Sequence, residues 1–300
     1  MIFSILYTVI VPIFLLIGLG VLLDRRFRLD LPTLNKLNFY AFVPALVFVK
    51  LLEADVSAGQ LARIGAFSLL HGALLFTLAW LIFSHRALKA HQTVLALGTL
   101  LSNVGNYGIP LVLLAFGDQQ IGVITVIVVV QNLLTFTLGI WLFERKGRQA
   151  RQVLASMLGI PVIYAVAIAL ALHFSYLRLP APIMVPLRYL ADGLIPIALL
   201  TLGAQLSRTR LTHGAPSLAT AGALRLLISP VVAAALIPVF GFTPPVSSVL
   251  IVASAFPVAV NVYILAAEYR QDEALASQAI FWTTLLSAVT MSMLLLLVRR

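Results

Sequence analysis

The sequence has no cysteine in its 300 residues, and its ten acidic residues are outnumbered by twenty basic ones. Without cysteine there is no disulfide framework, no thiolate catalysis and no thiolate metal site. The sequence also lacks the glycine-rich loops of P-loop and dinucleotide-binding proteins, and its five histidines show no HExxH spacing. These absences argue against an enzyme or an ATP-driven protein, and we expect no cofactor and no metal site.

Charged residues as a class are scarce. They make up 10% of the chain, whereas 61% is hydrophobic and the mean hydropathy is +1.07. No soluble domain of this length needs so much apolar surface, so the composition predicts a polytopic membrane protein. The net charge of +10 does not indicate nucleic acid as a partner, because the basic residues lie in short loops between apolar runs and set orientation there.

Ten apolar runs can be drawn, each long enough to cross a hydrocarbon core of about 30 Å as a helix. They cover residues 5–23, 33–52, 62–83, 93–116, 118–143, 152–172, 182–203, 216–240, 247–267 and 274–298. The first run has no basic residue ahead of it and is followed by Arg25, Arg26 and Arg28, the reverse of a secretory signal. With the N-terminus outside, most basic residues fall in inner loops. We therefore expect a retained first span and both termini outside.

The longest basic connection, residues 144–151, divides the runs into five and five. An odd number of spans per half gives the halves opposite orientations, which is an inverted repeat. We therefore predict a first repeat at 1–143, a cytoplasmic linker at 144–151 and an inverted second repeat at 152–300.

Two of the runs are interrupted at corresponding places in the halves. The stretch 99–116 contains Asn103, Asn106 and Pro110, and the stretch 253–267 contains Pro257 and Asn261. Proline and glycine interrupt a helix and leave backbone N–H and C=O groups without hydrogen bonds, and such unpaired groups are not tolerated in contact with hydrocarbon. A simple kink is the alternative, but paired interrupted segments are typical of a transporter binding site.

The chemistry of these breaks favours an anion. Neither break carries a carboxylate, and the half-helices would point partly positive N–H groups into a cavity. The asparagine amides could bind a ligand or could only satisfy frayed backbone groups. Two charges lie mid-span, Asp192 and Arg225; we favour an intramembrane pair between them, the alternative being that Arg225 draws an anion into the path.

Four motifs carry a resemblance that covers essentially the whole chain: NVGNYGIPL, VVVQNLLTFTLGIWLFERKG, LADGLIPIALLTLGAQL and FPVAVNVYILAAEYRQDEAL. With these the sequence resembles a bacterial member of the auxin efflux carrier family, which implies a place in the bacterial cytoplasmic (inner) membrane. That family is related to the plant PIN-FORMED auxin transporters and belongs with bile acid, arsenite and riboflavin-type transporters. The long cytoplasmic loop of many plant members is absent here, so phosphorylation control through it has no support.

The resemblance implies an all-α fold of ten transmembrane helices in two inverted five-helix repeats, similar to sodium/proton antiporters. Helices 4 and 9 would cross at their prolines. A scaffold of helices 1, 2, 6 and 7 would form a homodimer, and a transport domain of helices 3–5 and 8–10 would move like an elevator. Asn103 matches the family asparagine seven residues before the crossover proline, and Gln131 matches a glutamine near the plant substrate site.

We therefore predict a secondary transporter that binds a small organic anion, a carboxylate, at the helix 4/9 crossover. The expected substrate-site residues are Asn103, Asn106, Tyr107, Gly108, Ile109, Pro110, Gln131, Pro257, Val260 and Asn261. A sodium-coupled symporter of the bile acid type is the main alternative, and a channel or an intramembrane hydrolase is a more distant one.

Overall fold

The computed structural model of the chain describes residues 6–53, 57–86, 88–143, 158–175, 177, 179–211 and 216–298. Within these ranges nearly every residue is helical, apart from short connections and one isolated β-bridge. The predicted linker at 144–151 and the two chain ends lie outside the described residues.

Seven helices in the described ranges are long and apolar enough to cross a membrane. They are Leu6–Phe27 (η1, α2), Leu31–Glu53 (α3, η2, α4), Ala58–Phe83 (α5), Asp118–Phe143 (η5, α8, η6, α9), Ala181–Ser207 (α12), Pro216–Phe240 (α13, η7, α14) and Glu273–Val298 (α17). Two apolar helices are shorter, Val104–Phe116 (η4, α7) and Pro161–Phe174 (α11). The predicted multi-pass helical membrane protein is therefore confirmed.

The remaining helices are the halves of interrupted segments. The helix α6 (Gln92–Leu100) precedes η4 and α7, and α15 (Val246–Ser254) precedes α16 (Val260–Glu268). Each of the ten predicted apolar runs thus contains one helix or one interrupted pair. The inverted relation between the two halves stays a prediction.

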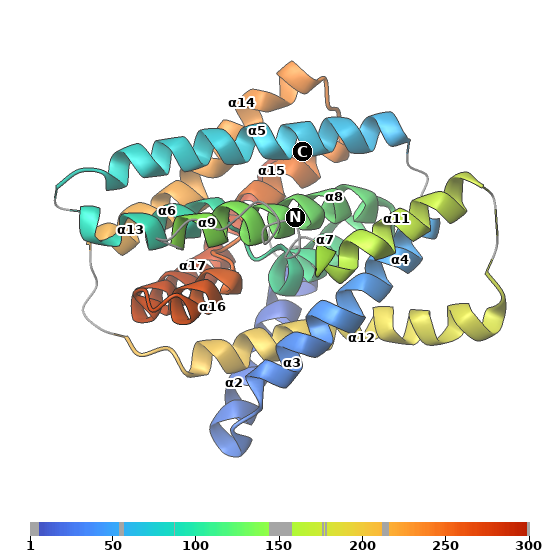
Figure 1. Ribbon diagram of the computed structural model, residues 1–300, viewed down its shortest axis with the longest axis horizontal. Helices are drawn as coiled ribbons and strands as arrows, with labels where there is room; N and C mark the ends of the chain where they lie inside the picture. The colour runs from blue at the N-terminus through green and yellow to red at the C-terminus, as the bar shows by residue number, and fades with distance from the viewer. Residues whose placement is uncertain are drawn as a thin grey trace.

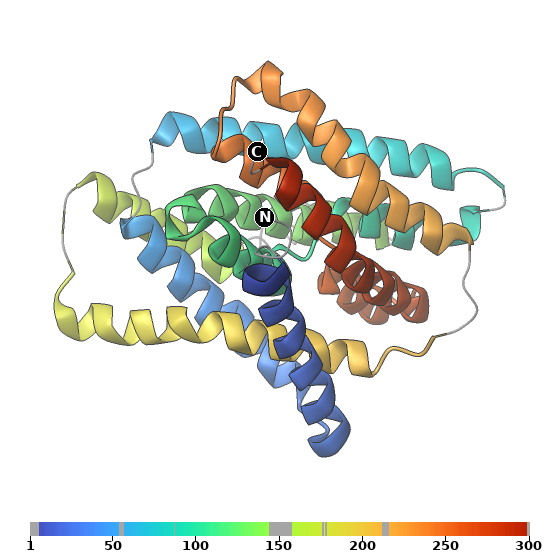
Figure 2. The same cartoon turned by 180° about the vertical axis from the view of Figure 1, so that it is seen from behind.

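The helices pack in two groups. The first contains α2, α4, α11 and α12, with α3 and η2 alongside; the second contains α5, α6, α8 and α13 to α17. In Figure 1 α2, α3 and α12 lie at the bottom, α4 and α11 rise beside α7, and α5 and α14 lie at the top; Figure 2 shows the same arrangement from behind. The predicted division into scaffold and transport domains, and their relative motion, stay predictions.

The first group is held together by a close approach of α2 and α12. A Cβ added at Gly20 would lie 2.2 Å from the carbonyl oxygen of Leu200, and one added at Gly203 would lie 2.0 Å from that of Ile17. Only glycine allows two helix backbones this near to each other. The close packing of α2 against α12 therefore depends on Gly20 and Gly203.

An ion pair lies at the end of the same contact. The carboxylate of Asp24 is 1% exposed and lies 2.7 Å from Nη2 of Arg208, with Nε at 3.1 Å. Ser207 also donates to this carboxylate. Such a two-pronged contact is the strong geometry for an arginine and a carboxylate, and hydrogen bonding to Asp24 raises the pKa of Arg208 above its ordinary value.

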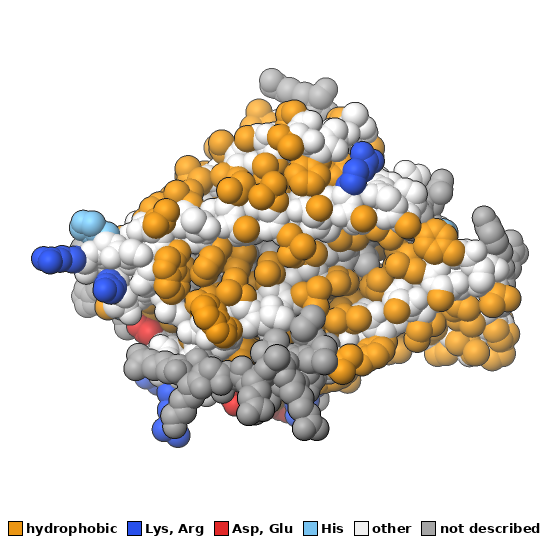
Figure 3. Space-filling model, turned by 45° about the horizontal axis from the view of Figure 1, so that its top comes forward, with side chains coloured by type: hydrophobic (Ala, Val, Ile, Leu, Met, Phe, Trp, Pro, Cys, Tyr) orange, Lys and Arg blue, Asp and Glu red, His pale blue; other side chains and the backbone are white. Residues whose placement is uncertain are grey.

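The exterior of the molecule is largely apolar. Hydrophobic side chains cover the face in Figure 3, with basic side chains near its margins. Large exposed hydrophobic residues occur along α2, α12 and α17, including Leu15, Tyr189 and Val289. An apolar exterior of this extent suits contact with lipid.

Candidate substrate site

The two helix breaks lie side by side and run antiparallel. Ser102 and Val258 form an antiparallel bridge. The N–H of Asn103 donates to the carbonyl of Pro257 at 2.8 Å, and the N–H of Ala259 donates to the carbonyl of Leu101 at 2.9 Å. Each break thereby satisfies backbone groups of the other, as non-helical backbone inside a membrane protein requires. The two segments that the sequence marks as interrupted meet at their breaks.

The crossing point differs from the one that the family resemblance implies. It lies at Ser102 and Val258, so Pro257 is adjacent to it but Pro110 is not. Pro110 lies within the helix Val104–Phe116, in α7 (Ile109–Phe116) and shortly after the π-turn Val104–Gly108, where it lacks the N–H that a helix interior would use. The expectation that both prolines mark the crossing was therefore wrong for Pro110.

Directly after the breaks, two helices begin, and their N-termini lie close to each other at one cavity. The helix that starts with η4 begins at Val104, and α16 begins at Val260. Among the described residues, the N–H groups of Gly105, Val260 and Asn261 have no hydrogen-bond partner. Unpaired N–H groups at a helix start carry positive partial charge and attract anions.

Asn103 caps the first of these helices. Its Oδ1 accepts a hydrogen bond from the N–H of Asn106 at 3.3 Å, and this contact identifies the oxygen of the amide. The side chain is 5% exposed, and within the described structure its Nδ2 has no hydrogen-bond partner. Leaving a buried donor unpaired costs about 1–3 kcal/mol. An acceptor bound at Nδ2 would recover that cost.

A cavity of about 390 Å³ lies in front of these groups, which is in the size range of small-molecule sites. One wall comes from the crossing segments and α8, and the other from α3 and η2 of the first helix group. The lining contains a basic side chain, Lys36, and no aspartate or glutamate. Its residues are Asn35, Lys36, Asn38, Phe39, Tyr40, Val43, Ser102, Asn103, Val104, Gly105, Asn106, Val128, Gln131, Asn132, Thr135, Phe136, Ala259, Val260, Asn261, Ile264 and Leu265.

Half of the predicted site residues line this cavity: Asn103, Asn106, Gln131, Val260 and Asn261. The other half do not: Tyr107, Gly108, Ile109, Pro110 and Pro257. Four of this second set follow the cap in one stretch and are buried in the hydrophobic core. The predicted residues at the two helix starts thus line the cavity, whereas the residues that follow Asn106 do not.

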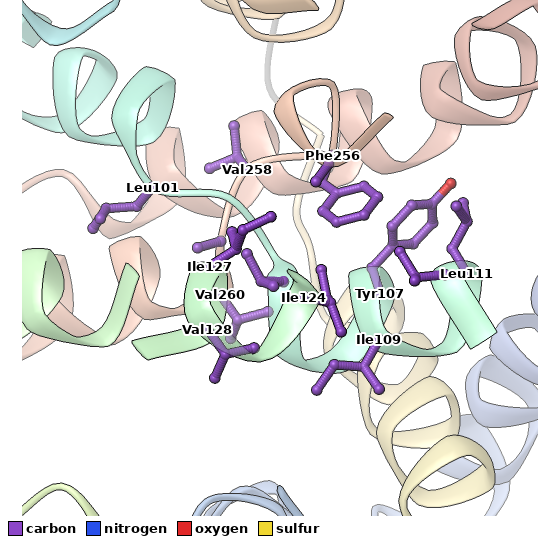
Figure 4. Close-up of a cluster of buried hydrophobic side chains, with 14 of the residues drawn as sticks. Leu101, Tyr107, Ile109, Leu111, Ile124, Ile127, Val128, Phe256, Val258 and Val260 are labelled. Atoms are coloured by element: carbon purple, nitrogen blue, oxygen red, sulfur yellow. The ribbon is translucent and has the colours of Figure 1, made fainter. Parts of the chain in front are cut away.

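Tyr107 and Gly108 have structural roles instead. The ring of Tyr107 packs edge-on to Phe256 with centroids 6.0 Å apart, as Figure 4 shows, and its hydroxyl accepts a hydrogen bond from Ser287 at 2.9 Å. A Cβ added at Gly108 would lie 2.4 Å from the same Phe256 ring. These two residues join the broken segments by packing.

A family profile described as "Membrane transport protein" matches residues 5–295 of the chain. The chain belongs to the membrane transport protein family. This confirms the resemblance to the auxin efflux carriers, and it makes the protein a transporter and not an enzyme.

Named relatives agree with this family. The transporter is 30% identical over 266 residues to an uncharacterized transporter of Methanothermobacter thermautotrophicus, with 87% of each chain covered. It is 25% identical over 300 residues to an uncharacterized transporter of Methanocaldococcus jannaschii, with 95% of each covered. It is 27% identical over 305 residues to a Rhizobium meliloti protein named "Putative malonate transporter", covering 97% of this chain and 95% of the relative.

In this transporter Gln131 both lines the cavity and braces the first break. Its Oε1 accepts from the N–H of Ser102 at 3.2 Å, and its Nε2 lies 3.5 Å from the carbonyl of Leu100. These contacts serve backbone groups that the helix break has freed. Gln131 therefore satisfies backbone groups at the helix break, whereas Nδ2 of Asn103 bonds no backbone group in the described structure.

The predicted pair of Asp192 and Arg225 is absent. Arg225 is buried and donates to the carbonyls of Thr99, Ser254 and Phe256. Asp192 is exposed on α12, and the described residues contain no ion pair between the two. The prediction was wrong because carbonyl groups at helix ends, which sequence does not mark, compensate the guanidinium.

Sequence reasoning missed the opposite wall of the cavity. Asn35 and Asn38 line it; Asn35 accepts from Gln205 at 3.0 Å, and Asn38 donates to Thr201 at 3.5 Å. The Oδ1 of Asn38 is buried and has no hydrogen-bond partner in the described structure. The signal was two amides three positions apart at the start of an apolar run, a spacing that places both on one helix face.

Proposed function

We propose that this protein is a secondary transporter for a small organic carboxylate, which binds with its carboxylate at the crossing of the two broken helices. The observation that carries the proposal is Asn103, which lines the cavity and whose buried Nδ2 has no hydrogen-bond partner in the described structure. A carboxylate oxygen is the acceptor that such a donor lacks, and a charged acceptor makes the stronger hydrogen bond.

Three further groups favour an anion at this point. The unpaired N–H groups of Gly105, Val260 and Asn261 belong to two helix starts that line the same cavity. Each helix start favours a negative charge by about 0.3–1 kcal/mol when exposed and by more when partly buried. Two starts and one amide donor supply a cradle for one carboxylate without a dedicated arginine.

The opposite wall suits a second polar group on the substrate. Lys36 lines the cavity and is exposed. A short dicarboxylate could place one carboxylate at Asn103 and the other toward Lys36. The name of the Rhizobium meliloti relative makes malonate the first such compound to test.

The position of the cavity supports a moving-domain mechanism. It lies between the two helix groups, since one wall belongs to η2 and α3 and the other to the crossing segments. Sliding of one group past the other would carry the site across the membrane, as in the elevator-like mechanism that the resemblance implies. The homodimer through the first group and the orientation with both termini outside belong to the same proposal.

The test is binding and uptake by purified protein. Malonate, acetate and a matched amine, 1,3-diaminopropane, are compared first by thermal shift in detergent, because a ligand that binds the native state raises the unfolding temperature. Uptake of labelled malonate into proteoliposomes follows. Saturable, competable uptake of carboxylates is the expected result. Tighter binding of the amine would overturn the substrate class, and flux without saturation would indicate a channel.

A further inference from the structure

Arg225 is the largest side chain among the fully buried residues of the described structure, with 2% of its surface exposed. It belongs to η7 (Leu224–Ile228) in the second helix group. Its Nε donates to the carbonyl of Phe256 at 2.7 Å, its Nη1 to that of Thr99 at 2.9 Å and its Nη2 to that of Ser254 at 2.5 Å. All three nitrogens of the guanidinium are therefore used.

These carbonyls come from both interrupted segments. Thr99 lies in the last turn of α6, Ser254 is the last residue of α15, and Phe256 lies in the second break. Carbonyl groups in the last turn of a helix have no N–H partner within it, and the end of the helix carries a partial negative charge. Arg225 thus places one positive charge between two negative helix ends.

No carboxylate neutralises this charge in the part of the chain that the structure describes, since none of its ion pairs includes Arg225. Burying an uncompensated cation is strongly unfavourable. The compensation here comes from carbonyl dipoles alone, which is the way a protein coordinates a small metal cation.

We propose that the guanidinium of Arg225 is a built-in cation that occupies the position of a coupling sodium ion at the crossing. Half-helix C-terminal ends and unwound carbonyls are the groups with which broken-helix transporters bind Na⁺. Here the three carbonyls already have a covalently attached cation. The carrier therefore binds its anion without sodium, which goes beyond the proposed function because it concerns the coupling ion.

Arg225 also acts as a positioning residue for the anion site. Phe256 precedes Pro257, whose carbonyl accepts the N–H of Asn103 at 2.8 Å. Thr99 lies four residues before Asn103 in the other segment. Losing the guanidinium frees carbonyls on both sides of the crossing, and the repulsion between them loosens the frame that aims Asn103 into the cavity.

The first experiment uses the unmodified protein and needs no substitution. Malonate affinity and unfolding temperature are measured in sodium chloride, potassium chloride and choline chloride at equal ionic strength. We expect malonate affinities within twofold of one another and no sodium-specific rise in unfolding temperature. A tenfold or greater loss of affinity when choline replaces sodium overturns the proposal.

The second experiment removes the cation. In Arg225→Met, which keeps much of the volume and removes every donor, malonate affinity in choline chloride should fall at least tenfold. Sodium chloride should raise the unfolding temperature of this variant above its value in choline chloride, because the vacated carbonyls bind Na⁺. Arg225→Lys should stay insensitive to sodium. The control is Arg188→Met, since Arg188 is exposed and pairs with Glu53.

Other outcomes contradict the proposal. Unchanged malonate affinity in Arg225→Met, or a folded variant with no sodium-specific stabilisation, overturns it. If Arg225→Met does not fold, sodium-dependent stabilisation of Arg225→Lys or of the unmodified protein overturns it, and its absence in both supports it. If the protein binds no carboxylate at all, the substrate proposal fails, while the sodium arm of the thermal measurement still tests the role of Arg225.

Discussion

Replacing Asn103 by alanine and by aspartate separates binding of an anion at this residue from its role as a helix cap. Alanine removes both the cap oxygen and the unpaired Nδ2 donor. Aspartate keeps an oxygen that can accept the N–H of Asn106, which now bonds Oδ1 at 3.3 Å, and it replaces the donor with a negative charge. Asparagine and aspartate cap a helix about equally well, whereas replacing the cap by alanine lowers the stability by about 1 kcal/mol.

We therefore expect the two variants to rank in one order by stability and in the opposite order by malonate affinity. In unfolding temperature, Asn103→Asp should lie near the unmodified protein and Asn103→Ala below it. In malonate binding the order should be unmodified protein, then Asn103→Ala, then Asn103→Asp. A merely destabilised site would give the same order in both measurements.

Magnitudes follow from the contact that is lost or gained. A hydrogen bond to a charged group contributes about 1.5–3 kcal/mol, so Asn103→Ala should weaken binding roughly 10- to 100-fold at about 1.4 kcal/mol per factor of ten. Two like charges about 4 Å apart repel by about 4 kcal/mol at an effective dielectric constant near 20. Asn103→Asp also loses this hydrogen bond, and the repulsion should make it bind about 1,000-fold more weakly than Asn103→Ala at neutral pH.

The assay is isothermal calorimetry with malonate at pH 7 and pH 5. Protonation of the introduced aspartate removes its charge, so the gap between the Asp and Ala variants should narrow as the pH falls toward the ordinary aspartate pKa of about 3.9. The unmodified protein at each pH corrects for protonation of malonate itself. Asn132→Ala is the matched control, because Asn132 lines the same cavity but donates to Val128 of its own helix at 2.9 Å. Equal binding by the Asp and Ala variants at pH 7 would refute the anion site at this residue.

Three other predictions concern packing, the buried ion pair and topology. Gly20→Ala should destabilise the protein by about 1–3 kcal/mol in chemical unfolding because its Cβ would overlap Leu200, whereas Gly18→Ala, with nothing within 4 Å, should not. Asp24→Asn should lower the unfolding temperature by the equivalent of about 1–2 kcal/mol, discounted because Arg208 is 38% exposed; an unchanged temperature would mean that the pair contributes nothing. Cysteines placed at Gly147 and Gln119 should react with impermeant reagents from opposite sides of the membrane, and labelling of both from one side would contradict the inverted repeat.

Hydropathy was sufficient to predict the helices, because spans of this length need little more than an apolar composition. It did not locate the first break. The local signal, Pro110, lies inside the helix Val104–Phe116, while the chain leaves the preceding helix at Leu101, where the second break supplies hydrogen-bond partners. The position of the break is decided by a contact between residues more than 150 positions apart, and a single window of sequence does not contain it.

Some residues of the candidate site could likewise be predicted from the sequence and others could not. Asn103, Asn106 and Asn261 were predicted because an amide in an apolar run is conspicuous. Asn35 and Asn38 were missed because they lie near the start of a run, where polar residues are ordinary. The partners of Arg225 were mispredicted for a different reason: a buried guanidinium can be compensated by main-chain carbonyls, and every residue has one.

The geometry of two antiparallel breaks explains why one crossing can hold both an anion and a cation. Every interrupted helix has a C-terminal end with unpaired carbonyls and, a few residues later, an N-terminal end with unpaired N–H groups. Where two such breaks pair antiparallel, as at Ser102 and Val258, both carbonyl ends meet on one side and both N–H ends on the other. Arg225 occupies the carbonyl side, and the cavity with Asn103 lies on the N–H side. The proposed anion preference and the proposed independence from sodium would then have a single cause, the direction of the helix ends, and neither requires a carboxylate at the crossing.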